Sequence, residues 1–147
     1  MSLTACAGPI CYSRGYKYQN NRTWWVQTEI LGVTASVPGY IDLAPDGRLT
    51  IHEGYAWDGA SRPAIDTRDF MRGSLAHDAG YQLIREGKIS DRHREAFDEL
   101  LVKLCKEDGM RSIRARWVLW AVKNFAAHAA ARRDRELLYA GVDPNLP

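Results

Sequence analysis

The spacing of apolar residues changes once along this chain, from alternation to the three-to-four-residue spacing of a helix. Before residue 58 apolar residues alternate with polar ones, as in the run Trp24, Val26, Thr28 and Ile30. From residue 67 onward they recur three and four residues apart. Alternation is typical of strands with one buried face, and the longer spacing is typical of helices. The chain is therefore predicted to be α+β, with a β-rich part at 15–58 and a helical part at 67–140.

Turn residues divide the front part into short strands. Gly32, Pro38-Gly39 and Asp46-Gly47 interrupt the alternation, and such residues favour tight turns between antiparallel strands. The strand candidates are Trp24 to Ile30, Val33 to Val37, Tyr40 to Leu43 and Leu49 to His52. A last extended run would bring Tyr55 and Trp57 to the turn at residues 58–63. We therefore expect a small N-terminal antiparallel β-meander packed on the helices.

Three helices are predicted in the second half of the chain. The first runs from about residue 67 to 86 and stops at Gly87, and the second follows a Ser90 N-cap and ends at Gly109. The inward residues of the second are expected to be Phe97, Leu101, Leu104 and Cys105. Ser112 begins the third, whose expected inward residues are Ile113, Trp117, Trp120, Ala121 and Phe125. A short tail helix is predicted at about 134–139.

Length and composition fit one domain. The chain has 147 residues, of which 46% are apolar, so we expect a single domain over 1–141 and an irregular tail at 142–147. No stretch approaches the roughly 20 apolar residues of a transmembrane segment, and no signal peptide pattern is present. The three cysteines predict no disulfide framework, although Cys6 and Cys11 could pair in an oxidising compartment. A net charge of +2 gives no reason to expect nucleic acid as a partner.

One helix face combines residues that could carry chemistry. His77 and Tyr81 are four residues apart on the apolar face of the first helix, whereas Asp78 is turned about 100° away. Asp78 would face a covering loop, and the preceding turn carries Asp58 and Gly59. Calcium prefers oxygen ligands from carboxylates, backbone carbonyls and water, and a nearby imidazole can act as a general base. The alternative is a hydrogen-bonded core histidine beside an ordinary turn.

The order of these motifs resembles two families. Ala76-His77-Asp78-Ala79-Gly80-Tyr81, the apolar positions of the second helix and the segment 117–125 are similar to the helical core of bacterial secreted phospholipase A2, over about residues 69–125. The chain is also similar, over about 25–126, to a phage and prophage family of unassigned function. That family has a strand-rich front, a Thr/Trp-Asp-Gly-Ala-Ser turn, a His-Asp-x-x-Tyr helix and a closing Ala-Val-Arg/Lys-x-Phe helix.

The resemblance implies roles for individual residues. His77 would be the general base that activates water, and Asp78 would be a calcium ligand. Tyr81 would help to hold the carboxylate that supports the base. Asp58 with the backbone of Gly59 would replace the calcium loop of the enzymes, and Ser61 would brace that turn.

Two departures from the phospholipase pattern concern the supporting acid and the calcium loop. Alignment on the apolar positions of the second helix puts Arg94 where the enzymes have an aspartate. Counting from the histidine selects Asp98, which would point inward only if the helix were rotated; Asp91 and Glu95 are the other candidates. The calcium loop of the enzymes is rich in glycine, whereas Gly59 is the only glycine between Trp57 and Pro63. This difference predicts a weak or absent calcium site.

Two functional hypotheses follow from the resemblance. The first is a phage-encoded, calcium-dependent acyl-ester hydrolase that acts on phospholipid at a membrane surface. The second is a virion or tail-associated structural protein that binds other virion proteins and keeps the scaffold with a degenerate site. Both place the chain in the host cytoplasm or the virion.

Basic and tryptophan residues give a further expectation about surfaces. Seven basic residues crowd the last third of the chain: Arg111, Arg114, Arg116, Lys123, Arg132, Arg133 and Arg135. They could face an anionic surface or form a solvated helix face. The five tryptophans could form an interfacial belt for lipid, or could belong to the core or to a protein interface.

Overall fold

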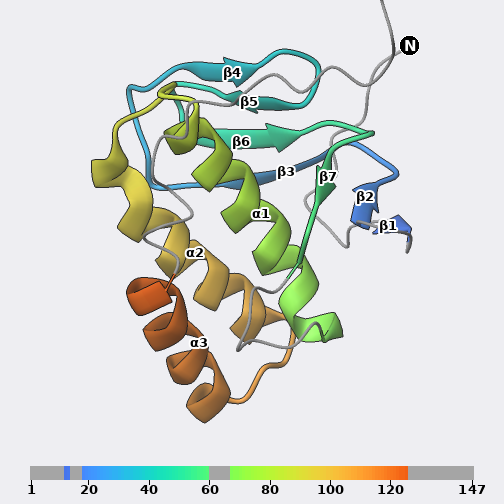
Figure 1. Ribbon diagram of the computed structural model, residues 1–147, viewed down its shortest axis with the longest axis vertical. Helices are drawn as coiled ribbons and strands as arrows, with labels where there is room; N and C mark the ends of the chain where they lie inside the picture. The colour runs from blue at the N-terminus through green and yellow to red at the C-terminus, as the bar shows by residue number, and fades with distance from the viewer. Residues whose placement is uncertain (1–11, 14–17, 60–66, 126–147) are drawn as a thin grey trace, which may run out of the picture.

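The computed structural model describes residues 12–13, 18–59 and 67–125, and it confirms the α+β class. Short strands occupy one end of the molecule and three helices extend from it (Figure 1). The predicted tail helix, the irregular tail, Ser61, Cys6 and Cys11 lie outside the described residues. Among the described residues, no helix has the length and hydropathy needed to cross a bilayer.

The larger sheet has four antiparallel strands in the order β3-β6-β5-β4. Its members are β3 (Trp24–Gln27), β4 (Ala35–Val37), β5 (Ile41–Leu43) and β6 (Arg48–Ile51). The predicted meander is correct for β4, β5 and β6 but wrong for β3, which pairs with β6 instead of β4. This is the strand order of a Greek key. The chain must therefore cross from one edge of the sheet to the other between β3 and β4.

Thr28 explains why the first predicted strand stops early. Its backbone N–H and its hydroxyl both donate to the carbonyl oxygen of Gly47, at 2.9 and 2.7 Å. Gly47 has a φ of +86°, and a Cβ there would lie 2.6 Å from the carbonyl oxygen of Thr28. Thr28 and Ile30 are thus buried by the turn between β5 and β6 and not by a strand ladder.

The smaller sheet carries the chain toward the helices. It consists of β1 (Tyr12–Ser13), β2 (Tyr18–Asn20) and β7 (Ala56–Trp57), in the order β1-β2-β7. Asn20 joins the two sheets, because its backbone N–H donates to Tyr55 O at 2.7 Å and its side-chain amide donates to Ile51 O at 3.2 Å. β7 therefore ends at a fixed place, immediately before Asp58.

The three predicted helices are present close to their predicted limits. They are α1 (Arg68–Arg85), α2 (Arg94–Glu107) and α3 (Ser112–Phe125), with a short 3-10 helix η1 (Asp91–His93) before α2. Ser90 caps η1, since its hydroxyl oxygen accepts from the Arg92 N–H. α1 packs on α2 and also contacts β4 and β6 of the larger sheet, and α3 packs on α2 (Figure 1). Cys105 is buried on α2, as predicted for a core residue.

The predicted inward face of α3 is wrong in most positions. Ile113, Trp117 and Trp120 are 86%, 40% and 54% exposed, while the helix buries Ala115, Val118 and Ala121. Of the predicted inward residues with a described side chain, only Ala121 is buried. The helix carries apolar residues on two faces, so periodicity alone did not identify the inner one. The smaller side chains face α2 and allow the two helices to pack closely.

Glycines on α1 allow α2 to approach it closely. A Cβ on Gly80 would lie 2.3 to 2.4 Å from the ring of Phe97, which is fully buried. A Cβ on Gly73 would lie 2.8 Å from the carbonyl oxygen of Leu101. Since neither distance is compatible with a real side chain, the separation of α1 and α2 depends on glycine at both positions.

Gly80→Ala is expected to destabilise the protein by about 1–3 kcal/mol, because overpacking of an enclosed ring outweighs the better helix propensity of alanine. Urea unfolding of the variant and the wild type measures this difference. Gln82→Ala, on the same helix but only half-buried, is the matched control and should change the free energy of unfolding by no more than about 0.5 kcal/mol. A Gly80→Ala protein as stable as the wild type would show that α2 can move away without cost.

Candidate functional site

The histidine and tyrosine of the His-Asp-x-x-Tyr helix meet one buried carboxylate. His77 Nε2 lies 2.9 Å from Asp98 Oδ1, and the Tyr81 hydroxyl donates to the same oxygen at 2.6 Å. The rings of His77 and Tyr81 are in contact, with centroids 4.0 Å apart. Asp98 is 1% exposed and His77 is 7% exposed. The three side chains thus form a compact polar network between α1 and α2.

Asp98 is the acid that contacts His77. Of the other candidates, Asp91 is exposed in η1, and Glu95 forms an ion pair with Lys123 at 2.8 Å. Arg94 is half-buried at the start of α2. The expectation that α2 must be rotated for Asp98 to point inward is wrong, because α2 lies between α1 and α3. A central helix buries a wider arc than an edge helix, and this arc includes both Phe97 and Asp98.

The shared carboxylate determines which histidine nitrogen is basic. The Asp98 oxygen accepts the Tyr81 hydroxyl, and it accepts the His77 Nε2–H when the proton of the neutral ring is on Nε2. The lone pair is then on Nδ1, which lies 3.8 Å from Asp78 Oδ1, too far for a direct hydrogen bond. The basic nitrogen of His77 therefore faces the side of the network where Asp78 lies.

Burial and charge act in opposite directions on the pKa of His77. Burial disfavours the imidazolium, but the neighbouring carboxylates of Asp78 and Asp98 outweigh it and raise the pKa above its usual 6.5. Burial, the hydrogen bond to Asp98 and the charge of Asp98 all raise the pKa of Tyr81. Tyr81 therefore stays a hydrogen-bond donor at neutral pH, and His77 is a stronger base than a free imidazole.

The two predicted metal ligands with carboxylates, Asp78 and Asp58, are both more exposed than the network. Asp78 is half-buried, with 30% of its side chain exposed, and Asp58 is exposed. Both carboxylates affect the phenol of Tyr55. Burial raises the pKa of this phenol, and the negative charges of Asp78 and Asp58 raise it further. The charges of both predicted metal ligands therefore act on the same buried phenol, although one ligand belongs to α1 and the other follows β7.

A tryptophan and a serine fix the corner that carries Asp58. Trp57 Nε1–H donates to Ser74 Oγ at 3.1 Å, and the Ser74 hydroxyl donates to Met71 O at 2.9 Å. Ser74 is on α1, one turn before His77. No role was predicted for this pair from the sequence. A serine on the apolar face of a helix and a tryptophan that needs a buried acceptor were the available signals.

The calcium ligands implied by the resemblance form a sparse set in the described residues. Asp58, Gly59 and Asp78 are described, and Gly59 is buried with a φ of +73°. Among the described residues no group of three or more His, Cys, Asp or Glu is arranged to hold a metal ion. A calcium ion at this corner would therefore need backbone carbonyls and water for most of its ligands.

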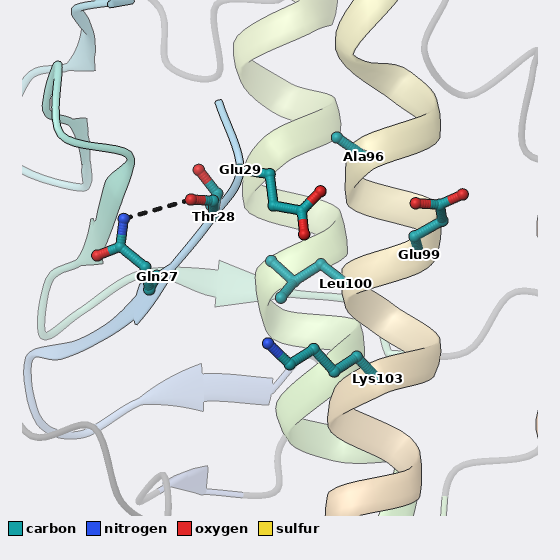
Figure 2. Close-up of a pocket in the computed structure, with 7 residues that line it drawn as sticks. All are labelled: Gln27, Thr28, Glu29, Ala96, Glu99, Leu100 and Lys103. Carbon is teal, nitrogen blue, oxygen red and sulfur yellow. Dashed lines mark hydrogen bonds between the residues drawn. The ribbon is translucent and has the colours of Figure 1, made fainter. Parts of the chain in front are cut away.

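A shallow hollow between the end of β3 and α2 is separate from this network. Its volume is about 190 Å³, below the roughly 300 Å³ at which small-molecule pockets begin. Figure 2 shows Glu29 extending toward α2, which contributes Glu99 and Lys103. The remaining lining residues are Gln27, Thr28, Ala96 and Leu100. Because His77 and Asp98 do not line this hollow, we do not assign it to the candidate site.

The raised pKa of His77 predicts how stability varies with pH. Folding favours the protonated imidazole, so its stabilising contribution is full below pH 6.5 and is lost as pH rises through the folded pKa. The free energy of unfolding of the wild type should therefore include a term that falls above pH 6.5, and this term should be absent in His77→Gln. His52→Gln, which alters the His52–Asp42 pair elsewhere, is the matched control and should retain it.

Direct NMR titration of the His77 ring gives the same pKa without a substitution. It should report a midpoint above 6.5 in the folded protein. A midpoint below this value would contradict the electrostatic account of the network.

No family model, curated protein or solved structure matches the chain. The function of the site is therefore inferred from the geometry of His77, Asp98, Tyr81 and Asp78 and from the motifs in the sequence.

Proposed function

We propose that this chain is a phospholipase A2-like hydrolase of phospholipid acyl esters, in which His77 is the general base. The observation that most supports this proposal is that one Asp98 oxygen lies within hydrogen-bond distance of both His77 Nε2 and the Tyr81 hydroxyl. A base whose far nitrogen is held by an oriented carboxylate is the arrangement used to activate a nucleophile in many hydrolases. The resemblance of the same residues to the phospholipase helix supports the ester substrate.

The proposed reaction uses the network in two proton transfers. Nδ1 of His77 takes a proton from water as the water oxygen bonds to the ester carbonyl carbon. Asp98 stabilises the resulting imidazolium, and Tyr81 keeps Asp98 in place. When the tetrahedral intermediate collapses, the bond to the alcohol oxygen breaks and Nδ1 returns the proton to it. The products are a fatty acid and a lysophospholipid, with no change of oxidation state.

In this proposal Asp78 would serve the carbonyl side of the same reaction. A calcium ion bound there would polarise the ester carbonyl and stabilise the negative charge that develops on its oxygen. Asp78, Asp58 and the Gly59 carbonyl are the groups that would hold it. Asp78 fits this role because it is partly exposed and its carboxylate lies 3.8 Å from Nδ1 of His77, without a direct hydrogen bond to it.

One observation favours the second hypothesis, a virion or tail-associated structural protein. His77 and Asp98 are both buried, and a satisfied buried network can also serve to hold two helices in a unique arrangement. In that case substitution of His77 would change stability and not a reaction rate.

The hydrolase is tested by fatty-acid release from phospholipid in mixed micelles. His77→Gln is expected to lower kcat by about 10²–10⁴-fold, the usual contribution of a general base. Activity of the wild type should rise with pH above 6.5, because only the neutral imidazole accepts a proton. Asp91→Asn, which changes an exposed acid at η1, is the matched control and should keep the wild-type rate. Equal rates for wild type and His77→Gln would remove the enzymatic proposal.

The calcium component is tested by thermal unfolding. A ligand that binds only the folded state at 100 times its Kd stabilises it by about 2.7 kcal/mol, so calcium should raise Tm by several degrees. Asp78→Asn should abolish this shift, whereas Asp91→Asn should leave it intact. Equal shifts in both variants would place any bound calcium elsewhere on the protein.

A further inference from the structure

The outer side of α3 presents large apolar side chains to solvent. Ile113, Trp117 and Trp120 are 86%, 40% and 54% exposed. They are separated by four and three residues, so they lie on one side of the helix and span about 10 Å along it. The side chains that the helix buries are the smaller Ala115, Val118 and Ala121. The helix therefore packs on α2 through its small residues and directs its largest ones outward.

The charged residues of α3 are all basic. α3 contains Arg114, Arg116 and Lys123 and no acidic residue. Arg114 interacts with Asp69 and Thr67, and Lys123 pairs with Glu95, so both are held to neighbouring helices. Arg116 is exposed, precedes Trp117 and lies one turn before Trp120. Arg111, just before the helix, is also exposed.

We propose that this face, formed by Ile113, Arg116, Trp117 and Trp120, docks on the surface of an anionic phospholipid bilayer. Tryptophan favours the boundary between headgroups and acyl chains, because its ring is apolar and its N–H can be hydrated. A helix with an apolar stripe and basic neighbours binds in the plane of that boundary. The absence of acidic side chains from α3 makes the face complementary to negative headgroups.

The size and charge of the face disfavour a second copy of the chain as the occupant. A stable protein interface buries about 800 Å² and about 20–30 residues on each partner. The α3 face offers three large apolar side chains on one helix. In a twofold dimer both partners would contribute the same face, so both copies of Arg116 would enter one interface without an acidic partner from α3.

Docking goes beyond the proposed function and does not require it. The face belongs to α3, whereas the His77 network is formed by α1 and α2. A protein without hydrolytic activity would still bind the bilayer through α3. If the hydrolase proposal is also correct, docking would bring the site to the surface that contains its substrate.

Co-sedimentation with vesicles tests the docking face. The wild type should sediment with vesicles of equal phosphatidylglycerol and phosphatidylcholine, and much less with phosphatidylcholine alone. Trp117→Ala/Trp120→Ala should weaken binding to the anionic vesicles by at least about tenfold, from the apolar area that these two rings bury. Arg116→Gln should weaken it by about fivefold and should have little effect on phosphatidylcholine.

Two control variants establish whether a loss of binding is specific to the α3 face. Leu31→Ala removes another exposed apolar side chain, outside α3 and at 68% exposure, and should bind like the wild type. His77→Gln should also bind like the wild type, so loss of hydrolysis and loss of docking are distinguishable. Docking is overturned if the wild type does not bind anionic vesicles, or if the double tryptophan variant binds as well as the wild type. It is also overturned if light scattering shows a dimer that this variant converts to monomer.

Discussion

The contact between Gly80 of α1 and the ring of Phe97 on α2 sets the geometry on which the candidate site depends. A Cβ on Gly80 would overlap this ring, so the absence of a side chain at Gly80 allows Phe97 to pack directly on the α1 backbone. Asp98 follows Phe97, and Tyr81 follows Gly80. The same contact therefore brings a carboxylate on one helix next to the hydroxyl and imidazole on the other. A wider separation would leave Asp98 buried without its two donors, which is strongly unfavourable for a charged group.

The helices were predictable from the sequence because their signals are local. Ser90, Gly87 and Gly109 mark helix ends through capping and backbone conformation, which depend on a few neighbouring residues. The strand order was not predictable in this way. β3 pairs with β6 from Trp24 opposite Ile51 to Gln27 opposite Arg48, and such pairing joins residues more than twenty positions apart in the sequence. Alternation indicates that a segment is extended, but it contains no information about which edge of a sheet receives it.

The same distinction applies to the candidate site. The i and i+4 spacing of His77 and Tyr81 on one helix identified two of its members. The partner acid required knowledge of how α2 is buried, since Asp98 lies beside the predicted apolar stripe and is buried where α2 meets His77 and Tyr81 of α1. α3 shows the opposite error. Its large apolar residues were assigned to the core, but the core contains its alanines and valine, and Trp117 and Trp120 remain outside. Side-chain size, which decides how closely helices approach, determined the buried face where hydrophobicity did not.

Exposure increases from Asp98 through His77 to Asp78, which lies beside the network, and this is the arrangement that a general base at His77 would need. The side chain of Asp98 is 2% exposed, that of His77 is 9% exposed, and that of Asp78 is 30% exposed. A network that only joins two helices gains nothing from a partly hydrated end, because water competes for its hydrogen bonds. A base that accepts a proton from water needs such an end, together with a buried carboxylate that stabilises the cation it becomes. The order Asp98, His77, Asp78 provides both, with the basic Nδ1 on the hydrated side. This order supports proton transfer at His77 more strongly than the His-Asp-x-x-Tyr motif does by itself.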